Sequence, residues 1–406
     1  MGVALLIAST FLLLFQLGDT FNPLLRHSRR RRVDAPITSL RQAEEHDVEV
    51  EGLPEGATAK LVRFNVDEKL LNADPNDEDV LVTAMSGDGS LIVRAVSNKR
   101  VVEETQNRGS YPPLVLGVLG ELMSSTLLYG GVLKDAPITV VNLAGSNVIS
   151  GMHSASNCDG GVRGMCQDDF DASACPELFD VGSLPQGTRR VPIRFLFSNG
   201  AAGDAQIQII KDHRTFKEPY KTWGNILDGP VDTNLGGTLS QSESRPVVLR
   251  CVCDVQKGNG EGGLEDPSGQ PIEIKAAGGI FIDRMPRYDD ASLERAIANV
   301  EALEEKGLSN LLQEGKSVKD LIDLVLDGLN PIYTAAIKPK FLCECPFEET
   351  MATVKGMSRE DQRKDFPKGQ ETELVCVQCK RKRRFSWEEV KDRLEITEEE
   401  ETLWPA

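Results

Sequence analysis

Four cysteines near the C-terminal end constrain what this chain can fold into more than any other feature. They form two close pairs, Cys343-x-Cys345 and Cys376-x-x-Cys379, with thirty residues between the pairs. Four thiolates arranged in this way can surround one Zn²⁺ tetrahedrally at about 2.3 Å each, and a long excursion between two pairs is typical of zinc ribbons. The spacing therefore predicts one zinc site whose metal ligands are Cys343, Cys345, Cys376 and Cys379.

The first pair is unusual because only one residue separates its two cysteines. Thiols this close could join if the metal left, and a disulfide across so few bonds stores strain and is easily reduced again. A basic run at residues 380–384, beside Cys379, adds positive charge that favours thiolate and so reactivity toward oxidants. Spacing alone leaves two interpretations open: a redox switch, and an inert structural zinc ribbon whose basic run is a solvated loop.

The long segment before these cysteines has the pattern of a mixed α/β domain. Apolar residues recur at roughly helical spacing over residues 113–133 and predict a core helix that Gly130-Gly131 ends. Alternating or apolar runs predict strands at 61–64, 91–96, 138–141 and 248–253. On the last strand Cys251 and Cys253 point to one face, and we interpret both as buried structural thiols.

A polar, Gly/Asp-rich stretch at residues 157–184 predicts an insertion loop, and a Gly-rich surface loop is predicted at 258–269. The first loop holds three cysteines that we interpret as incidental, although their effect on any switch stays open: Cys158, Cys166 and Cys175. Neither loop contains a phosphate-binding or dinucleotide fingerprint, and no His/Ser/Asp arrangement stands out among the four histidines. We therefore expect no catalytic residues, no nucleotide cofactor and no enzymatic activity.

The sequence pattern changes at residues 288–330, which predict short helices. Apolar residues from Leu293 to Leu303 form one helical stripe, and Ser317 with Asp320 predicts a capping box that opens another helix. Such short, acidic helices are not stable without packing on a neighbour. If the zinc domain is that neighbour, its loss would release the helices and expose their apolar stripes.

The N-terminal segment reads as a two-part leader. Residues 3–17 form an apolar run followed by small residues, as in a signal peptide, and the next segment is Arg-rich and acid-poor up to Asp34, as in a transit peptide. Such a combination resembles the leaders that send proteins into the plastids of secondary endosymbiotic algae. We expect a plastid stroma, with plain secretion, the cytoplasm or another reducing compartment as alternatives. A reducing destination is favoured because an oxidising lumen would keep the cysteine switch oxidised.

These patterns together predict an α+β fold with a mixed α/β domain, a helical linker and a small zinc domain. The expected divisions are a signal peptide at 1–20, a transit-like leader at 21–46, the mixed α/β domain at 47–286, a helical linker at 287–338, the zinc domain at 339–394 and an acidic tail at 395–406. The net charge of −17 repels nucleic-acid phosphates. We expect no nucleic-acid partner and no membrane partner in the mature form.

The zinc motif, with Phe341 before it and Val375 before the second pair, resembles the zinc centre of the 33 kDa chaperonin family, the redox-regulated heat-shock holdases. Other motifs occur in the family's order: Tyr111-Pro112-Pro113, Leu119-Gly120-Glu121-Leu122-Met123, Leu133-Lys134, Gly161-Val162-Arg163-Gly164, Gln241-Ser242-Glu243, Ala276-Ala277-Gly278-Gly279 and Met285-Pro286. The resemblance covers roughly residues 58–394. The chain departs from the family pattern at Pro346 and Glu349, where Ser and Arg are usual, but these changes leave the four ligands in place.

This resemblance implies an ATP-independent holdase that is inactive when reduced and bound to one Zn²⁺. It implies that disulfides Cys343–Cys345 and Cys376–Cys379 accompany zinc release, unfolding of the linker, conversion of a monomer to a homodimer and capture of unfolded client proteins. Two other functions remain as alternatives. One is a zinc-ribbon nucleic-acid adaptor that uses residues 380–384, and the other is a thiol-disulfide oxidoreductase that uses Cys376 and Cys379.

Overall fold

The computed structural model describes residues 66–131, 138–180, 190–212, 218–260, 263–286, 288–343, 345, 347–376 and 378–404, and the backbone of β1 (Ala43–Val48) and β2 (Ala59–Phe64). The expected signal peptide at 1–20 and most of the expected leader at 21–46 lie outside these residues. The chain divides into two compact units. The large unit ends at Leu342, and the small unit contains all described residues from Cys343 onward.

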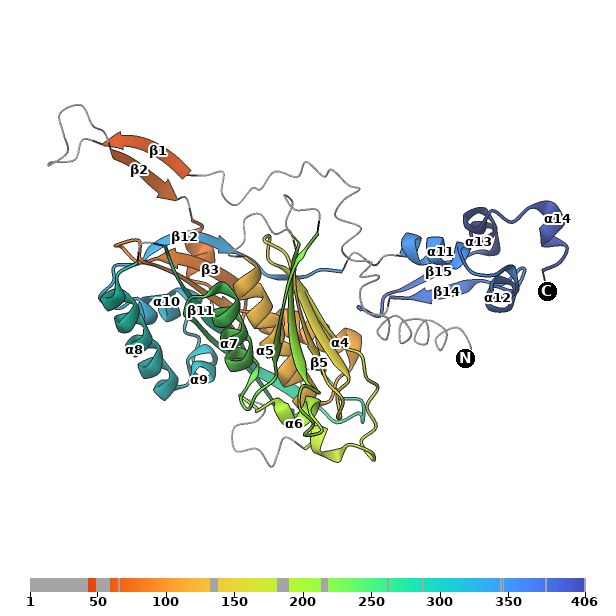
Figure 1. Cartoon of the computed structure of the whole chain (residues 1–406), viewed down its shortest axis with the longest axis horizontal. Coiled ribbons are helices and arrows are strands. Elements are labelled where there is room, and N and C mark those ends of the chain that lie inside the picture. Colours follow the sequence, from red (N-terminus) through yellow and green to blue (C-terminus); the bar gives the residue numbers. More distant parts are fainter. Residues whose placement is uncertain are drawn as a thin grey trace. The chain divides into compact units, whose positions relative to one another are not determined.

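Two β-sheets form the frame of the large unit (Figure 1). The antiparallel five-stranded sheet has the order β10 (Val247–Lys257), β11 (Ile272–Arg284), β4 (Leu91–Ser97), β3 (Val80–Met85) and β12 (Ile332–Ile337). The six-stranded sheet has the order β13 (Lys340–Phe341), β7 (Gly161–Cys166), β6 (Gly151–Ser156), β5 (Ile138–Ala144), β8 (Gln206–Asp212) and β9 (Tyr220–Asn225). Its strands are antiparallel except that β13 runs parallel to β7. The mixture of helices and several sheets confirms the predicted α+β class.

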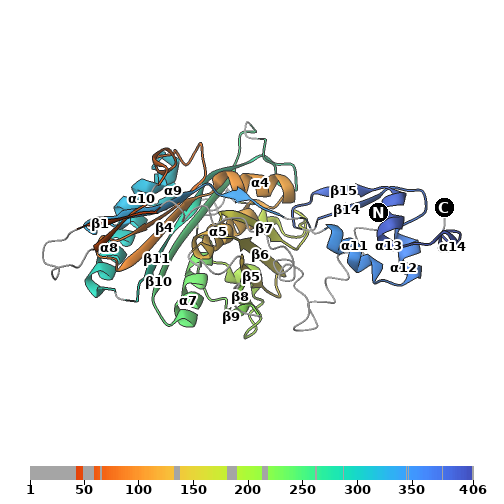
Figure 2. The ribbon, with the colours of Figure 1, turned by 90° about the horizontal axis from the view of Figure 1, so that it is seen from above.

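Helix α5 (Pro113–Gly130) lies between the two sheets and is the centre of the larger core (Figure 2). It starts with a proline at its first position and is capped by Gly131, as the sequence predicted. Its length and apolar composition would allow it to cross a membrane, yet the whole helix is buried inside the protein. The helix is therefore the core element that organises both sheets.

Glycines allow α5 to approach both sheets closely. A Cβ atom at Gly120 would lie 2.3 Å from the Cys253 sulfur, and one at Gly164 on β7 would lie 2.7 Å from Cγ of Met123. Cys251 and Cys253 are both buried against the helix, where the Ser125 hydroxyl donates a 3.2 Å hydrogen bond to the Cys251 sulfur. The prediction that these two cysteines are buried on one face of a strand is confirmed.

The other helices of the large unit lie around this frame. They are α3 (Glu68–Leu71), α4 (Lys99–Gly109), α6 (Arg194–Phe197), α7 (Val231–Glu243), α8 (Asp290–Lys306), α9 (Leu308–Gln313) and α10 (Val318–Val325), with a short 3₁₀ turn, η2 (Pro176–Leu178).

Helices α8, α9 and α10 pack on the face of the five-stranded sheet that is turned away from α5 (Figure 1). The predicted stripe on α8 is buried there, and the capping box of Ser317 and Asp320 is present at the start of α10. The neighbour that buries these stripes is therefore the sheet itself. The zinc domain, which the sequence suggested as this neighbour, is not needed to bury them.

The predicted insertion loop at 157–184 is wrong at its start. Residues 161–166 form β7, which pairs with β6 and places Cys166 in the core. Two glycines in this strand interrupt the apolar alternation that would have signalled it, and one of them, Gly164, is required by the close approach of α5. The remainder, residues 167–180, has the expected irregular form around the turn η2.

The small unit is a hairpin surrounded by helices. The strands are β14 (Thr372–Val375) and β15 (Lys382–Phe385), and the helices are α11 (Phe347–Lys355), α12 (Arg359–Asp365), α13 (Trp387–Leu394) and α14 (Glu398–Glu401). Its buried apolar side chains are Phe347, Met351, Val354, Phe366, Leu374, Phe385, Trp387, Val390, Leu394, Ile396 and Trp404. Trp404 donates a 2.8 Å hydrogen bond from Nε1 to the carbonyl of Phe366, and its ring lies 5.9 Å from that of Trp387. The last described residues therefore pack into this unit.

Candidate metal centre

Two chain turns present the four cysteines. Cys376 and Cys379 lie in the turn between β14 and β15, which is closed by hydrogen bonds of 2.8 Å from Cys376 N to Arg381 O and from Lys380 N to Cys376 O. Cys345 has a positive φ of 46°, a backbone angle that residues other than glycine rarely adopt. Its carbonyl accepts a 2.7 Å hydrogen bond from Phe347 N. These two turns carry the four cysteines whose sulfurs lie within 4.8 Å of one another.

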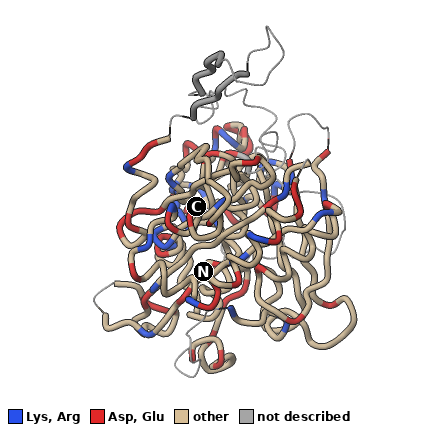
Figure 3. The backbone as a smooth tube through the Cα atoms, turned by 90° about the vertical axis from the view of Figure 1, so that its left-hand side faces the viewer, with Lys and Arg blue, Asp and Glu red and all other residues tan. Residues whose placement is uncertain are grey.

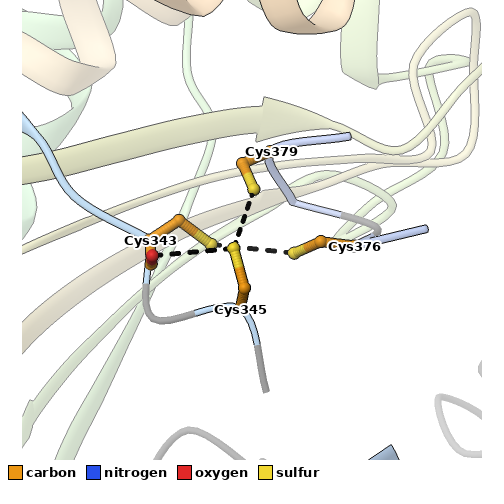
Figure 4. Close-up of side chains that lie close together, drawn as sticks. All are labelled: Cys343, Cys345, Cys376 and Cys379. Atoms are coloured by element: carbon orange, nitrogen blue, oxygen red, sulfur yellow. Dashed lines mark hydrogen bonds between the residues drawn. The ribbon is translucent and has the colours of Figure 1, made fainter. Parts of the chain in front are cut away.

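The four sulfurs converge on one point (Figure 4). The Cys343 and Cys376 sulfurs lie 3.7 Å apart, the Cys345 and Cys379 sulfurs lie 3.2 Å apart, and all four lie within 4.8 Å of one another. Four sulfurs held tetrahedrally at about 2.3 Å from one ion lie about 3.8 Å from each other, whereas bonded sulfurs lie about 2.05 Å apart. The geometry fits a shared metal ion, and none of the nine cysteines, all of which lie in the described part of the chain, forms a disulfide.

Hydrogen bonds within the cluster shift the pKa values of its thiols in opposite directions. A hydrogen bond from the Cys343 thiol lowers the pKa of Cys376 to about 5, helped by the backbone N–H groups of Cys379 and Gln378. Donating that bond raises the pKa of Cys343, while burial raises the pKa of Cys345 to about 12. A bound cation would favour thiolate at all four positions, so metal binding would release protons.

Acidic side chains pair with three of the five residues in the basic run beside this cluster. Lys382 lies 2.9 Å from Glu373, and Arg384 lies 3.3 Å from the same carboxylate. Arg383 lies 2.9 Å from Glu348. The run is therefore not an unopposed patch of positive charge.

Sequence reasoning did not single out Glu348. This residue on α11 accepts hydrogen bonds of 3.0 and 3.1 Å from Arg393 on α13 as well as one from Arg383 on β15. It thus ties the helix after the first cysteine pair to the hairpin that carries the second pair. No sequence pattern marks this role, because the three residues come together only in the folded unit.

The remaining five cysteines belong to the large unit. Burial raises the pKa of Cys166, Cys251 and Cys253, which makes them poor nucleophiles, and Cys158 and Cys175 are half-buried. Within the described ranges, the four C-terminal cysteines are the one group of His, Cys, Asp and Glu side chains placed to hold a metal ion. The structure brings together the four residues that the sequence predicted as metal ligands.

Comparisons with known proteins agree with this architecture. The profile of one family, described as Hsp33 protein, matches residues 79–386. The chain is 24% identical over 322 residues to the 33 kDa chaperonin of Clostridioides difficile, an alignment that covers 79% of this chain and 99% of the relative. It is also 24% identical over 324 residues to the 33 kDa chaperonin of Desulforamulus reducens, covering 80% of this chain and all of the relative.

A solved structure shows the same fold. The crystal structure of the 33 kDa chaperonin of Thermotoga maritima has a TM-score of 0.58 and 19% sequence identity, and the match covers 78% of this chain and 98% of that chain. The matched segment takes in both sheets, helices α8 to α10 and the cysteine cluster. The chain therefore belongs to the Hsp33 protein family, whose relatives are named 33 kDa chaperonins.

Proposed function

We propose that this protein is an ATP-independent chaperone that holds unfolding proteins under oxidative stress. In this proposal the reduced, zinc-bound form is an inactive monomer, and disulfide formation with zinc release produces an active homodimer. Residues 339–394 would be the redox switch and residues 287–338 the segment that responds to it. The observation that carries the proposal is the convergence of four sulfurs, from two separate turns, within 4.8 Å of one another.

The chemistry of the switch follows from the thiols. Oxidation of one cysteine pair by hydrogen peroxide removes two electrons and two protons from the thiols, forms one S–S bond and reduces the hydrogen peroxide to two molecules of water. Paired as Cys343–Cys345 and Cys376–Cys379, the four sulfurs would no longer offer thiolates to an ion. A bound Zn²⁺ contributes on the order of 10–16 kcal/mol of apparent folding free energy to a small four-thiolate domain. Oxidation would therefore act as an unfolding signal for the small unit.

The family relationship supports the chaperone role, because the relatives are named chaperonins. The two alternatives gain no support from the site. The Cys376-x-x-Cys379 motif joins two strands and does not open a helix of a βαβ unit, as an oxidoreductase motif would. Three residues of the basic run pair with Glu373 or Glu348. Acidic and basic residues are also interspersed in the view of Figure 3, which does not favour a nucleic-acid adaptor.

The test follows zinc content and client aggregation together on the chain that begins at residue 47, before and after peroxide at mildly elevated temperature. We expect one zinc to be lost in step with a gain in anti-aggregation activity, and both changes to be reversed by dithiothreitol and zinc. A Cys175→Ser variant, changed outside the cluster, should behave as the unmodified chain. Zinc-free, oxidised protein that fails to slow the aggregation of a heat-denatured client would refute the proposal.

We propose the plastid stroma as the site of action, on the basis of the leader chemistry at residues 1–46. A fusion of these residues to a fluorescent protein should enter the plastid of an alga with secondary plastids. Secretion of the fusion, or its retention in the cytoplasm, would contradict this location while leaving the chaperone proposal intact.

A further inference from the structure

One extended segment forms the last strand of both sheets. This segment, residues 332–342, is called the strap. Its first part, β12, pairs antiparallel with the outer edge of β3, and its second part, β13, pairs parallel with β7. Lys340 N donates a 3.0 Å bond to Gly160 O, and Leu342 N donates a 2.9 Å bond to Val162 O. The next residue in the chain is Cys343, so the strap links both sheet edges covalently to the metal centre.

The strap is held less firmly than the strands beside it. Ile332 is exposed, the other residues of β12 are half-buried, and the pairing with β3 shifts register between Tyr333 and Ala335. β3, in contrast, is largely buried along its length. A short, irregular edge strand with half-exposed side chains is the part of a sheet that separates most readily.

A few side chains anchor the strap. The Tyr333 hydroxyl donates a 2.5 Å hydrogen bond to Asp323 on α10, and Arg108 lies over the Phe341 ring at 4.6 Å. Tyr333 and Ala336 also pack against the core cluster beneath α8 to α10. These contacts define what the edge accepts. It fits an extended backbone with apolar groups at the positions of Tyr333 and Ala336.

We propose that the strap seat, meaning the outer edges of β3 (Val80–Met85) and of β7 at Gly161 and Val162, binds an extended segment of a non-native polypeptide. The strap fills this seat while the metal centre is intact. Its detachment after the small unit unfolds leaves a row of unpaired backbone N–H and C=O groups beside an apolar core. Strand addition at such an edge recognises backbone and alternate side chains, so many unrelated segments fit it. The inference rests on the proposed function, because it names the surface that the active form would use.

The test uses the full chain and a fluorescent peptide that copies the strap, residues 332–342. We expect the peptide to bind the oxidised, zinc-free chain at least tenfold more tightly than the reduced, zinc-bound chain, measured by fluorescence anisotropy. The matched control peptide carries Ala335→Pro and Ala336→Pro, which remove two backbone N–H groups and should abolish binding. An unfolded client protein should compete with the strap peptide.

The position of the peptide is read by a benzophenone side chain placed at its Tyr333 position. Cross-links should fall on β3 or α10, and amides of residues 81–85 should gain exchange protection when the peptide binds. Cross-links to β9, the open edge at the other end of the six-stranded sheet, would overturn the assignment. Equal binding in the reduced and oxidised states would overturn it as well.

Two further outcomes distinguish a failure of the strap-seat proposal from a failure of the chaperone proposal. Oxidised chain that suppresses aggregation but does not bind the peptide would refute the strap seat and leave the chaperone proposal standing. Peptide binding by oxidised chain that does not suppress aggregation would instead refute the chaperone proposal and retain the seat as a strand-binding edge.

Discussion

The two units of this protein are held together by different means. In the large unit, two sheets enclose one fully buried helix, and three more helices cover the other face of the five-stranded sheet. Buried apolar side chains therefore form two large clusters in this unit. The small unit has a modest set of buried apolar side chains and draws its two halves together at four sulfurs. The contrast indicates that the stability of the small unit should depend on metal binding and on the redox state of its cysteines. The stability of the large unit should depend on apolar packing.

The largest expected effect separates the units directly. Cys379→Ser removes one of four thiolates from the cluster, and the small unit should lose its zinc and unfold, because its apolar core is small. Hydrogen exchange should rise through residues 347–404 and stay low in β4, β11 and α5. Cys175→Ser is the control and should keep one zinc per chain. Loss of protection throughout α5 would show that the units do not respond separately.

A second change tests whether packing also matters in the small unit. Trp404→Ala removes a buried ring and its hydrogen bond to Phe366, and such truncations cost about 3–5 kcal/mol. We expect zinc to be lost to a chelator faster, with the thermal transition of the large unit unchanged. The neighbouring Leu403 is 63% exposed, so Leu403→Ala should have little effect. Equal zinc loss in the two variants would mean that the C-terminal residues do not support the metal centre.

A third change addresses the large unit alone. Gly120→Ala places a methyl group against the Cys253 sulfur, and overpacking of this kind costs about 1–3 kcal/mol. Urea unfolding of the large unit should shift to lower concentration, while zinc content stays at one per chain. The control is Gly237→Ala in α7, where the added methyl meets open space and should stabilise the helix by up to about 1 kcal/mol. Zinc loss in the Gly120 variant would contradict the separation of the units.

The smallest expected effect lies at Glu348. Hydrogen bonds from Arg393 hold the pKa of this carboxyl below its ordinary value of 4.5. Because its pKa is lowered on folding, the stability that it contributes is fully present above pH 4.5 and is lost as the pH falls through the lowered value. Glu348→Gln should cost about 0.5 kcal/mol because the pairs are solvent-exposed. The loss should shrink at high salt, and a salt-independent loss would point to packing instead of charge.

Local patterns in the sequence predicted the parts of the fold that depend on neighbours along the chain. Pro113 and Gly131 bound the central helix, Ser317 and Asp320 cap α10, and the cysteine spacing marks the metal centre. Contacts between distant residues were not predictable in this way. β7 was missed because Gly164 serves the approach of α5, and the strap was missed because β12 and β13 take their partners from strands more than 170 residues earlier.

The sulfur contacts also determine how tightly the chain is looped. Each close contact joins cysteines more than thirty positions apart, Cys343 with Cys376 and Cys345 with Cys379, so an intact cluster closes a loop that contains α11 and α12. Closing a loop of that length lowers the entropy of the unfolded chain by an amount worth about 3–4 kcal/mol. Disulfides within each pair close only very short loops, so the unfolded chain regains most of this entropy. Disulfides between the pairs would keep the long loop closed. Which sulfurs join therefore determines whether oxidation opens the small unit or locks it.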